Sequence, residues 1–464
     1  MVKDLRYFID VLERKNPENV VRVKREVDPR FELSGVLRKL QDQNKFPAVM
    51  FSHVKGSEIS VISNVIGKPE NIPLALETTE DKALEAYSKA VDHPIEPKIV
   101  NTGPIRDVVM TGSDVDLTKL PVITNCEKDD GPYITAGITL VKDPDTGVRD
   151  TGIFKGAIRG KNKVILPMEE HARANYDFRK AEAAGKPLEA VVFIGHHPAV
   201  ALGSQAKVPY TVDDLAVMSG LLREPLELVK CETVDLEVPA YAEIALEGRI
   251  LPKVREYHGA FGDFAKYYAH PPSPSSVFEV TAITHRKDAI YQHIFAAHPE
   301  HNLHGKLARE TVLYQRVKAI VPMVQKVSLP MSGLCRFTAY VSIRKDYDGA
   351  GKLAALGALA SDPFIKLAII VDQDVNVSNE TEVLWAIATR THANEAIFVV
   401  PDAAVSGIDP SAYTVRSRVE KGRLNAKWAI DATKPVEAPF AEFSDVPRQV
   451  WERIDLKDYV EGWK

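Results

Sequence analysis

The middle of this 464-residue chain contains a succession of short apolar runs that are separated by turn residues. Runs of this length and alternation are typical of β-strands, and many of them in succession favour a barrel or another closed sheet. We therefore expect a β-rich barrel or closed sheet between residues 103 and 284. The runs that carry this prediction are 134–141, 164–166, 191–195, 200–202 and 277–284.

The two flanks have a different pattern. Apolar residues recur at helical spacing in residues 4–15, and an alternating strand follows at 20–23. After Gly305 helical and strand patterns alternate again, with a buried strand at 367–372. Each flank is therefore expected to be an α/β unit. The first one contains a further helix and two strands, which are predicted at 29–43, 48–51 and 60–63.

Two glycine- or proline-rich segments constrain the loops. The stretch 270–276 holds three prolines, which lack the N–H that a central strand needs, so we expect a loop there. Gly349-Ala-Gly-Lys352 resembles a phosphate-binding loop, but neither Ser nor Thr follows the lysine. This segment is expected to be a turn at the start of a helix.

Length and composition narrow the class of protein. A chain of 464 residues is too long for one ordinary core, so two or three domains are expected. The net charge of −5 argues against a nucleic-acid surface, and no apolar run approaches the roughly 18 to 20 residues of a membrane helix. The N-terminus lacks the apolar segment of a secretory signal, so a cytoplasmic location is expected. The spacing of Cys126, Cys231 and Cys335 fits no zinc or redox motif and indicates reduced, buried thiols.

Two acids and one histidine in the central unit are candidate metal ligands. Asp150, His171 and Asp214 together offer oxygen donors and a single imidazole, which suit Mg or Mn better than a structural zinc. Their spacing alone is a weak signal, because scattered surface acids are the ordinary interpretation.

Several motifs occur in an order that is similar to that of a known family. The two most specific are the block from Leu228 to Gly248 and the run from Val383 to Arg390. With these motifs the chain resembles the UbiD-type decarboxylases, and the resemblance extends from residue 5 to residue 435. The other motifs that carry it are 103–108, 116–121, 259–263 and 366–374.

The resemblance implies a mixed α/β (α+β) fold in three domains. They are an N-terminal α/β domain (1–102), a central split-barrel flavin-binding domain (103–304), and a C-terminal α/β domain with a terminal helix (305–464). It also implies prenylated FMN, with a divalent metal (manganese, magnesium or iron) and a potassium ion at its phosphate. The cofactor would carry the hard step, because decarboxylation of an sp² carbon leaves electrons that the protein cannot accept.

The family's metal ligands fall on the same three residues. Its asparagine falls on Asp150, its histidine on His171 and its glutamate on Asp214. The extra charge of Asp150 favours a metal but repels a phosphate, so the resemblance leaves the coordination open. The family's flavin contacts fall on Ile153, Phe154, Ser204 and Gln205, and Glu170 and His171 also lie beside the cofactor, with Glu170 in place of the usual glutamine.

This chain departs further from the family at the positions of its Glu-Arg-Glu/Asp network. The arginine position holds Lys155, the first carboxylate position holds His258, and Asp263 keeps the expected type. Lysine is a point charge where arginine is a bidentate fork, so the grip on a carboxylate should be looser. His258 can shuttle a proton near neutral pH, and Asp263 can set its tautomer or act as the acid. The alternative is a stabilising ion-pair network in a site that has drifted.

A histidine-rich stretch runs from His285 to His304. His298, His301 and His304 have a spacing that can place them on one helical face as metal ligands. The ordinary interpretation, a polar loop and helix start at the mouth of the substrate site, is favoured. Arg309 can meet a second anionic group of a substrate, although a solvated helix arginine is the default.

The functional hypothesis is reversible, non-oxidative decarboxylation through a prenylated-FMN adduct. The substrate would be an aromatic, heteroaromatic or α,β-unsaturated acid, and the changed residues suggest a dicarboxylate or an aryl-CoA of the phthaloyl type. Alternatives are the same scaffold with plain FMN, a carboxylase with a partner subunit, and a non-catalytic subunit. A flavin prenyltransferase would supply the cofactor. The amphipathic segment 450–460 would dock on another subunit of a homo-oligomer (dimer or hexamer) or on its own chain.

Overall fold

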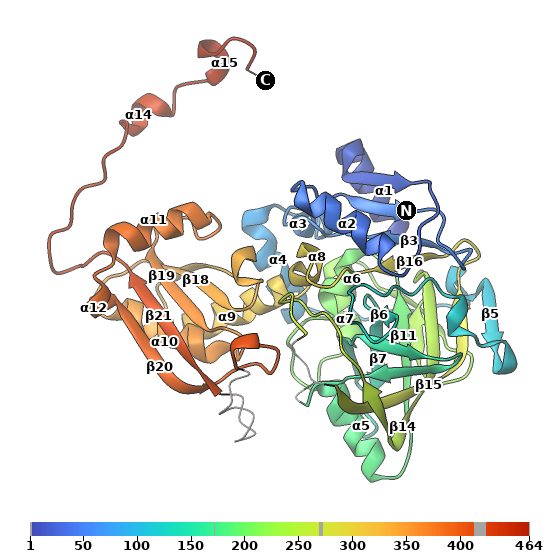
Figure 1. The fold of residues 1–464 in the computed structure, drawn as a ribbon. Helices are drawn as coiled ribbons and strands as arrows, with labels where there is room; N and C mark the ends of the chain where they lie inside the picture. Colours follow the sequence, from blue (N-terminus) through green and yellow to red (C-terminus); the bar gives the residue numbers. More distant parts are fainter. Residues whose placement is uncertain (1, 171, 269–271, 413–423, 464) are drawn as a thin grey trace.

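The computed structural model describes residues 2–170, 172–268, 272–412 and 424–463 (Figure 1). In the N-terminal unit, α1 (Leu5–Lys15) buries Leu5, Phe8, Ile9 and Leu12, and Asp4 caps it by accepting a hydrogen bond from the Tyr7 N–H. α1 and α2 (Glu32–Asp42) pack on opposite faces of a four-stranded sheet. Its strands are, in order, β1 (Val20–Val23), β2 (Ala48–Phe51), β3 (Ser60–Ser63) and β16 (Ile290–His293).

The central unit is built around a nine-stranded sheet. Its order is β6-β9-β10-β15-β14-β11-β7-β8, and β5 pairs with β15. The long hairpin of β14 and β15 shifts register after Glu247 and again after Ile250, and such bulges bend a sheet. The strands are β5 (Val108–Thr111), β6 (Tyr133–Ile134), β7 (Ile138–Lys142), β8 (Arg149–Ile153), β9 (Gly156–Arg159), β10 (Lys163–Leu166), β11 (Leu188–Ile194), β14 (Ile244–His258) and β15 (Ser273–His285).

Helices and a small sheet border the central sheet. The helices of this part are α3 (Asn71–Ala75), α4 (Ala83–Asp92), α5 (Arg173–Ala183), α6 (Pro198–Gly203), α7 (Asp214–Leu222) and α8 (Pro299–Leu303). The small sheet has the order β13 (Glu237–Pro239), β12 (Glu227–Lys230) and β4 (Lys98–Ile99). Because α5 and α7 begin beside β8, their first residues lie at the end of the sheet that carries the candidate site.

Two predictions about the central unit were wrong. The run 200–202 is not a strand but part of α6, because His197 caps a helix whose first residue is Pro198. The stretch 270–276 is not wholly a loop, because β15 begins at Ser273 and Pro274 pairs with Tyr257 of β14. The proline is tolerated because β10, the other neighbour of β15, pairs only as far as Ser276, so Pro274 faces a single strand.

The C-terminal unit is the second α/β unit of the chain. Its five-stranded sheet has the order β17-β18-β19-β21-β20, and β19 is the buried strand predicted at 367–372. Gly349, with φ 93°, begins α10 as expected. The elements are α9 (Lys306–Ile320), β17 (Val324–Ser328), β18 (Thr338–Ile343), α10 (Ala350–Ser361), β19 (Leu367–Asp372), α11 (Glu380–Arg390), α12 (Ala393–Ala396), β20 (Ile397–Ala404) and β21 (Leu424–Ala432).

The C-terminal tail, which begins after β21, extends away from the rest of the chain (Figure 1). Instead of one amphipathic helix, its described residues contain two short helices, α14 (Arg448–Trp451) and α15 (Leu456–Tyr459), whose side chains are exposed except for the half-buried Val450. The contact of Phe443 with Trp385 of α11 holds the start of this tail near the C-terminal unit. The described tail therefore leaves its apolar side chains in solvent.

Two further predictions concern the membrane and the thiols. None of the helices in the described ranges has the length and apolar content that crossing a bilayer requires. Cys126, Cys231 and Cys335 are free thiols that are half-buried or buried, and burial raises the pKa of Cys126 and of Cys335 to about 12.

Candidate active site

Asp150 and Asp214 form a buried carboxylate pair where β8 meets α7. Asp214 is the first residue of α7, which Asp213 caps. Its Oδ2 accepts hydrogen bonds from the backbone N–H and the hydroxyl of Thr151 on β8, at 2.8 and 2.9 Å. Asp150 precedes Thr151 on the same strand, so the two carboxylates that the resemblance assigned to a metal lie together.

Arg173, the first residue of α5, holds this pair. Its Nε donates to Oδ1 of Asp150 at 2.6 Å, and one Nη donates to Oδ1 of Asp214 at 2.9 Å. Burial raises the pKa of Asp214 to about 8; the Arg173 charge opposes this shift and the Asp150 charge adds to it. Burial likewise raises the pKa of Asp150. Burial thus makes it costly to ionise both carboxyl groups together, and Arg173 is the cation that contacts both of them.

The donors of this pair fit a hard divalent ion. Buried carboxylate oxygens are the ligands that Mg²⁺ and Mn²⁺ prefer. His171, the predicted third ligand, lies outside the described residues. Within the ranges that the structure describes, no three His, Cys, Asp or Glu side chains are grouped closely enough to hold a metal. Two of the three predicted ligands are therefore placed together.

The predicted flavin contacts lie at the end of β8 and in the connections that follow α6 and β10. Ile153 ends β8, and the Phe154 ring packs over Gly152, where a Cβ would come within 2.9 Å of it. Ser204 ends α6, and Gln205 donates to it from the next position. Glu170 is exposed in the connection between β10 and α5. These residues thus come from three separate connections of the central unit.

Lys155, His258 and Asp263 lie in a second cluster, which begins where β8 ends. His258, the last residue of β14, shares a hydrogen bond of 3.1 Å between its Nε2 and the backbone carbonyl of Lys155. The ring of His258 packs against Tyr133. Burial lowers the pKa of Lys155, while the charge of Asp263 opposes that shift. His258 therefore contacts the backbone of Lys155, and Asp263 acts on its ammonium group.

The histidine-rich stretch adds to this second cluster. Nε2 of His301 lies 3.8 Å from Oδ1 of Asp263, and burial holds the pKa of His301 well below its usual value. His304 shares a hydrogen bond of 2.8 Å with the Glu300 carbonyl. His298 contacts Phe46 and Phe295 instead. The three histidines do not converge, which favours the polar helix start over a metal site.

Arg336 is, like Arg173, a residue that sequence reasoning missed. It precedes β18, donates to Oδ1 of Asn302 at 2.9 Å, and lies over the Phe264 ring at 4.4 Å. Burial and the neighbouring Arg309 lower its pKa to about 10. Arg309 itself donates to Asp362 at 2.5 Å and lies over Phe364. No motif marks Arg336 in the sequence, because it stands in an ordinary segment before a strand.

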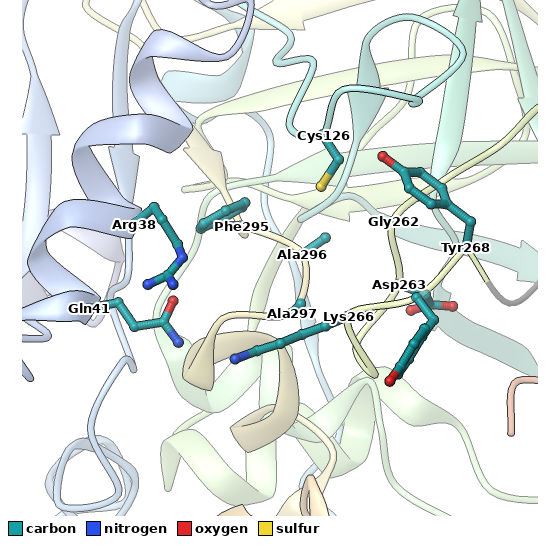
Figure 2. A pocket seen from close by; sticks show the side chains of 11 residues that line it. Arg38, Gln41, Cys126, Gly262, Asp263, Lys266, Tyr268, Phe295, Ala296 and Ala297 are labelled. Atoms are coloured by element: carbon teal, nitrogen blue, oxygen red, sulfur yellow. The ribbon is translucent and has the colours of Figure 1, made fainter. Parts of the chain in front are cut away.

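A cavity of about 220 Å³ borders Asp263 (Figure 2). Figure 2 shows Arg38 and Gln41 of α2 across this cavity from Asp263 and Tyr268. An apolar cavity of about 150 Å³ holds benzene, so this one is large enough for a single substituted ring. The other lining residues are Cys126, Gly262, Lys266, Tyr267, Phe295, Ala296 and Ala297.

Comparison with known proteins identifies the scaffold. Three domain families of 3-octaprenyl-4-hydroxybenzoate carboxy-lyase match in order: the N-terminal domain at residues 10–91, the Rift-related domain at 98–299 and the C-terminal domain at 302–432. A curated relative, the anhydromevalonate phosphate decarboxylase of Methanothermobacter thermautotrophicus, is 35% identical over 96% of this chain and 100% of its own length.

Solved structures agree. The UbiD-class enzyme HmfF of Pelotomaculum thermopropionicum, in complex with FMN, is 39% identical with a TM-score of 0.92 and covers 98% of this chain and 100% of that one. An evolved dimeric form of HmfF with prenylated FMN is 37% identical with a TM-score of 0.88, over 99% and 100%. The 3,4-dihydroxybenzoic acid decarboxylase of Klebsiella pneumoniae is 28% identical with a TM-score of 0.87, over 97% and 99%. The predicted family and the mixed α/β fold with a curled sheet are confirmed: this chain belongs to the UbiD family of carboxy-lyases.

Proposed function

We propose that the chain catalyses reversible, non-oxidative decarboxylation of an aromatic, heteroaromatic or α,β-unsaturated acid that carries a second anionic group. The observation that carries this proposal is the cluster of two buried cations, Lys155 and Arg336, around the carboxylate of Asp263; the charge of Glu169 also acts on Lys155, and that of Asp362 on Arg336. Two buried cations in one site suit a substrate with more than one anionic group, which would pair with both of them.

Lys155 is proposed to hold the carboxylate that leaves as carbon dioxide. Burial lowers its pKa, and an incoming anion would pair with the ammonium group and oppose that shift. His258 is proposed as a positioning residue, because its Nε2 contacts the Lys155 carbonyl at 3.1 Å. This bond fixes the backbone from which the ammonium group extends.

Asp263 is proposed as the proton donor. When carbon dioxide leaves, the bond's electron pair stays on the substrate carbon, and the Asp263 proton would form the new C–H bond there. The cavity beside Asp263 gives the carboxylate a route to recover its proton from solvent. His301, 3.8 Å from Asp263, is neutral at physiological pH and so does not tie the carboxylate into a permanent ion pair.

Prenylated FMN is the proposed cofactor, and it would supply the electron sink when bound. Asp150, Asp214 and His171 would hold a divalent ion, manganese, magnesium or iron, at its phosphate, with potassium as the monovalent ion. Ile153, Phe154, Glu170, Ser204 and Gln205 would contact the flavin. Support comes from the HmfF structures, one with FMN and one with prenylated FMN. A flavin prenyltransferase is the proposed supplier.

Arg336, together with Arg309, is proposed to bind the second anionic group. Arg309 already donates to Asp362, whereas the hydrogen bonds of Arg336 within the described ranges go to the neutral acceptors Asn302 and Leu334. Its guanidinium is therefore the better candidate for a carboxylate or phosphate. The name of the 35% identical relative includes a phosphate-bearing substrate, which agrees with this proposal.

Assembly and domain limits are also proposals. The exposed apolar residues of the tail, among them Trp451, Leu456 and Trp463, suit a contact with a second copy of this chain in a homo-oligomer. The dimeric HmfF form shows that a relative with this scaffold assembles into a dimer. A cytoplasmic location and the division at residues 102/103 and 304/305 stay predictions.

The test is to co-express the chain with a flavin prenyltransferase, purify it without oxygen, and measure the absorption spectrum, metal content and released cofactor mass. Prenylated FMN is expected, with carbon dioxide release from doubly anionic acids and much less from their monoanionic analogues. Activity with plain FMN would mean that FMN, and not prenylated FMN, is the cofactor. Colourless, inactive protein would favour the non-catalytic subunit.

A further inference from the structure

Arg173 occupies one oxygen of each carboxylate that a divalent ion would use. Oδ2 of Asp214 is already used by two hydrogen bonds from Thr151, so Oδ1 is the oxygen left for a cation. Arg173 donates to this Oδ1 at 2.9 Å and to Oδ1 of Asp150 at 2.6 Å. A divalent ion on these atoms would lie against the guanidinium, and like charges repel.

A second position for the guanidinium exists on the same helix. Asp177 follows Arg173 by four residues in α5, so both project from one face of the helix. Its side chain is 2% exposed, and Oδ1 has no hydrogen-bond partner within the described part of the chain. The neighbouring Asp143 already accepts from Lys180 with both oxygens. Asp177 is thus a buried carboxyl group with an oxygen left to accept a hydrogen bond; burial raises its pKa to about 7, and the charges of Lys180 and Arg173 oppose that shift.

We propose that Arg173 is a resident counter-cation that exchanges with the divalent metal. Without metal it bridges Asp150 and Asp214 and keeps them together; when the metal binds, the guanidinium moves one helical turn to Asp177. The exchange also compensates the extra negative charge that Asp150 brings to a position where the family has asparagine. Two aspartates, one arginine and a divalent ion leave the same charge, +1, as one carboxylate with a divalent ion. This inference rests on the metal site of the proposed function.

Binding of MnCl₂ to the full-length protein produced without a prenyltransferase tests the exchange. Free Mn²⁺ is followed by its electron paramagnetic resonance signal, and thermal unfolding is measured with and without the ion. Arg173→Gln should lower the Tm of the metal-free protein and tighten Mn²⁺ binding by about tenfold, because the competing cation is gone. If the variant binds Mn²⁺ equally or more weakly, Arg173 supports the site instead and the proposal is overturned.

Asp177→Asn tests the second position. Mn²⁺ binding should weaken by about threefold to tenfold, because the displaced guanidinium loses its partner, whereas the metal-free Tm should not fall. In the double variant with Arg173→Gln, Asp177→Asn should leave the Mn²⁺ affinity unchanged. An equal weakening in both backgrounds would mean that Asp177 attracts the ion directly, and it would overturn the exchange.

Two controls complete the design. Arg179→Gln makes the same chemical change at an exposed position of α5 and should behave as the wild type. If Arg173→Gln does not fold, Arg173→Lys keeps the charge but cannot bridge two carboxylates, and its Mn²⁺ affinity should rise moderately; an equal or lower affinity overturns the proposal. Absence of Mn²⁺ binding in both wild type and variants would overturn the metal site itself, whereas equal tight binding would overturn the exchange alone.

Discussion

Two charged clusters begin five residues apart, at Asp150 and Lys155, and they differ in how their charges are paired. In the first, Arg173 bridges two buried carboxylates, so every charged group has a partner. In the second, Lys155 and Arg336 lie around the carboxylate of Asp263, and the charge of Glu169 also acts on Lys155. The first cluster is thus two carboxylates around one cation, and the second is two cations around a central carboxylate.

The difference indicates what each cluster is for. A cluster that is already paired holds its shape without a ligand and admits a cation only by exchange. A cluster of two buried cations around a central carboxylate is held at the expense of stability, because buried charge that is not fully paired is unfavourable. Such an expense is typical of binding sites, where a ligand completes the pairing. We therefore expect substitutions in the second cluster to change activity more than stability.

The largest expected effect is that of Asp263→Asn, which removes the acid and keeps the shape. If Asp263 donates the proton, kcat should fall by about 10²- to 10⁴-fold, as for loss of a general acid. Initial rates of carbon dioxide release measure this, and thermal unfolding should show a lower Tm, because Lys155 and Arg336 lose a buried counter-charge; the rates are therefore compared at a temperature at which both proteins are folded.

Asp130→Asn is the matched control, because Asp130 lies against the same loop but pairs with Arg159 at the surface. A kcat for Asp263→Asn within about tenfold of wild type would show that the proton comes from elsewhere. The second cluster would then lose its proposed acid.

Arg336→Gln should have a smaller and substrate-dependent effect. Loss of a charge-assisted hydrogen bond costs about 1.5–3 kcal/mol, so kcat/KM should fall by about 10- to 100-fold for an acid with a second anionic group. For the monoanionic analogue of the same acid it should hardly change. The measurement is the ratio of kcat/KM for such a substrate pair.

Arg344→Gln controls for this change, since Arg344 is exposed at the opposite end of the same strand, β18. Equal losses for both substrates would mean that Arg336 acts on the fold or on the carboxylate that leaves. The second cation would then have no role in selecting a second anion.

The fold could be predicted where local pattern and tertiary context agree. The strands at 20–23, 48–51 and 60–63 were predicted with their observed limits, because each is a short apolar run with clear turns on both sides. The predictions for residues 200–202 and for Pro274 were wrong for opposite reasons. At 200–202 the apolar run predicted a strand, but the capping residue His197 and Pro198 begin a helix there. At Pro274 the proline predicted a loop, but β10 ends before this position, so no strand lies on that side to need the missing N–H.

The candidate site was predictable only in part, and for a physical reason. The resemblance pointed to Asp150, Asp214, Lys155, His258 and Asp263, whose roles stay predictions although the structure brings them into two clusters. Arg173 and Arg336 carried no signal, because an arginine in a polar helix or before a strand is ordinary on its own. Their importance comes from burial beside other charges, which is a property of the folded chain.

The smallest expected effect, and the most specific, is that of Lys155→Arg on the pH profile. Burial lowers the pKa of Lys155, so in wild type the fraction with a protonated lysine, and with it kcat/KM, should fall as the pH rises through that lowered value. Arginine stays protonated at any pH at which the protein is folded. The alkaline limb of kcat/KM should therefore move to higher pH in the variant, while activity near pH 7 stays within about tenfold. Lys161→Arg, at an exposed turn between β9 and β10, should leave the profile unchanged. An unshifted limb in Lys155→Arg would mean that another group titrates there, and that Lys155 does not need its charge to bind the substrate.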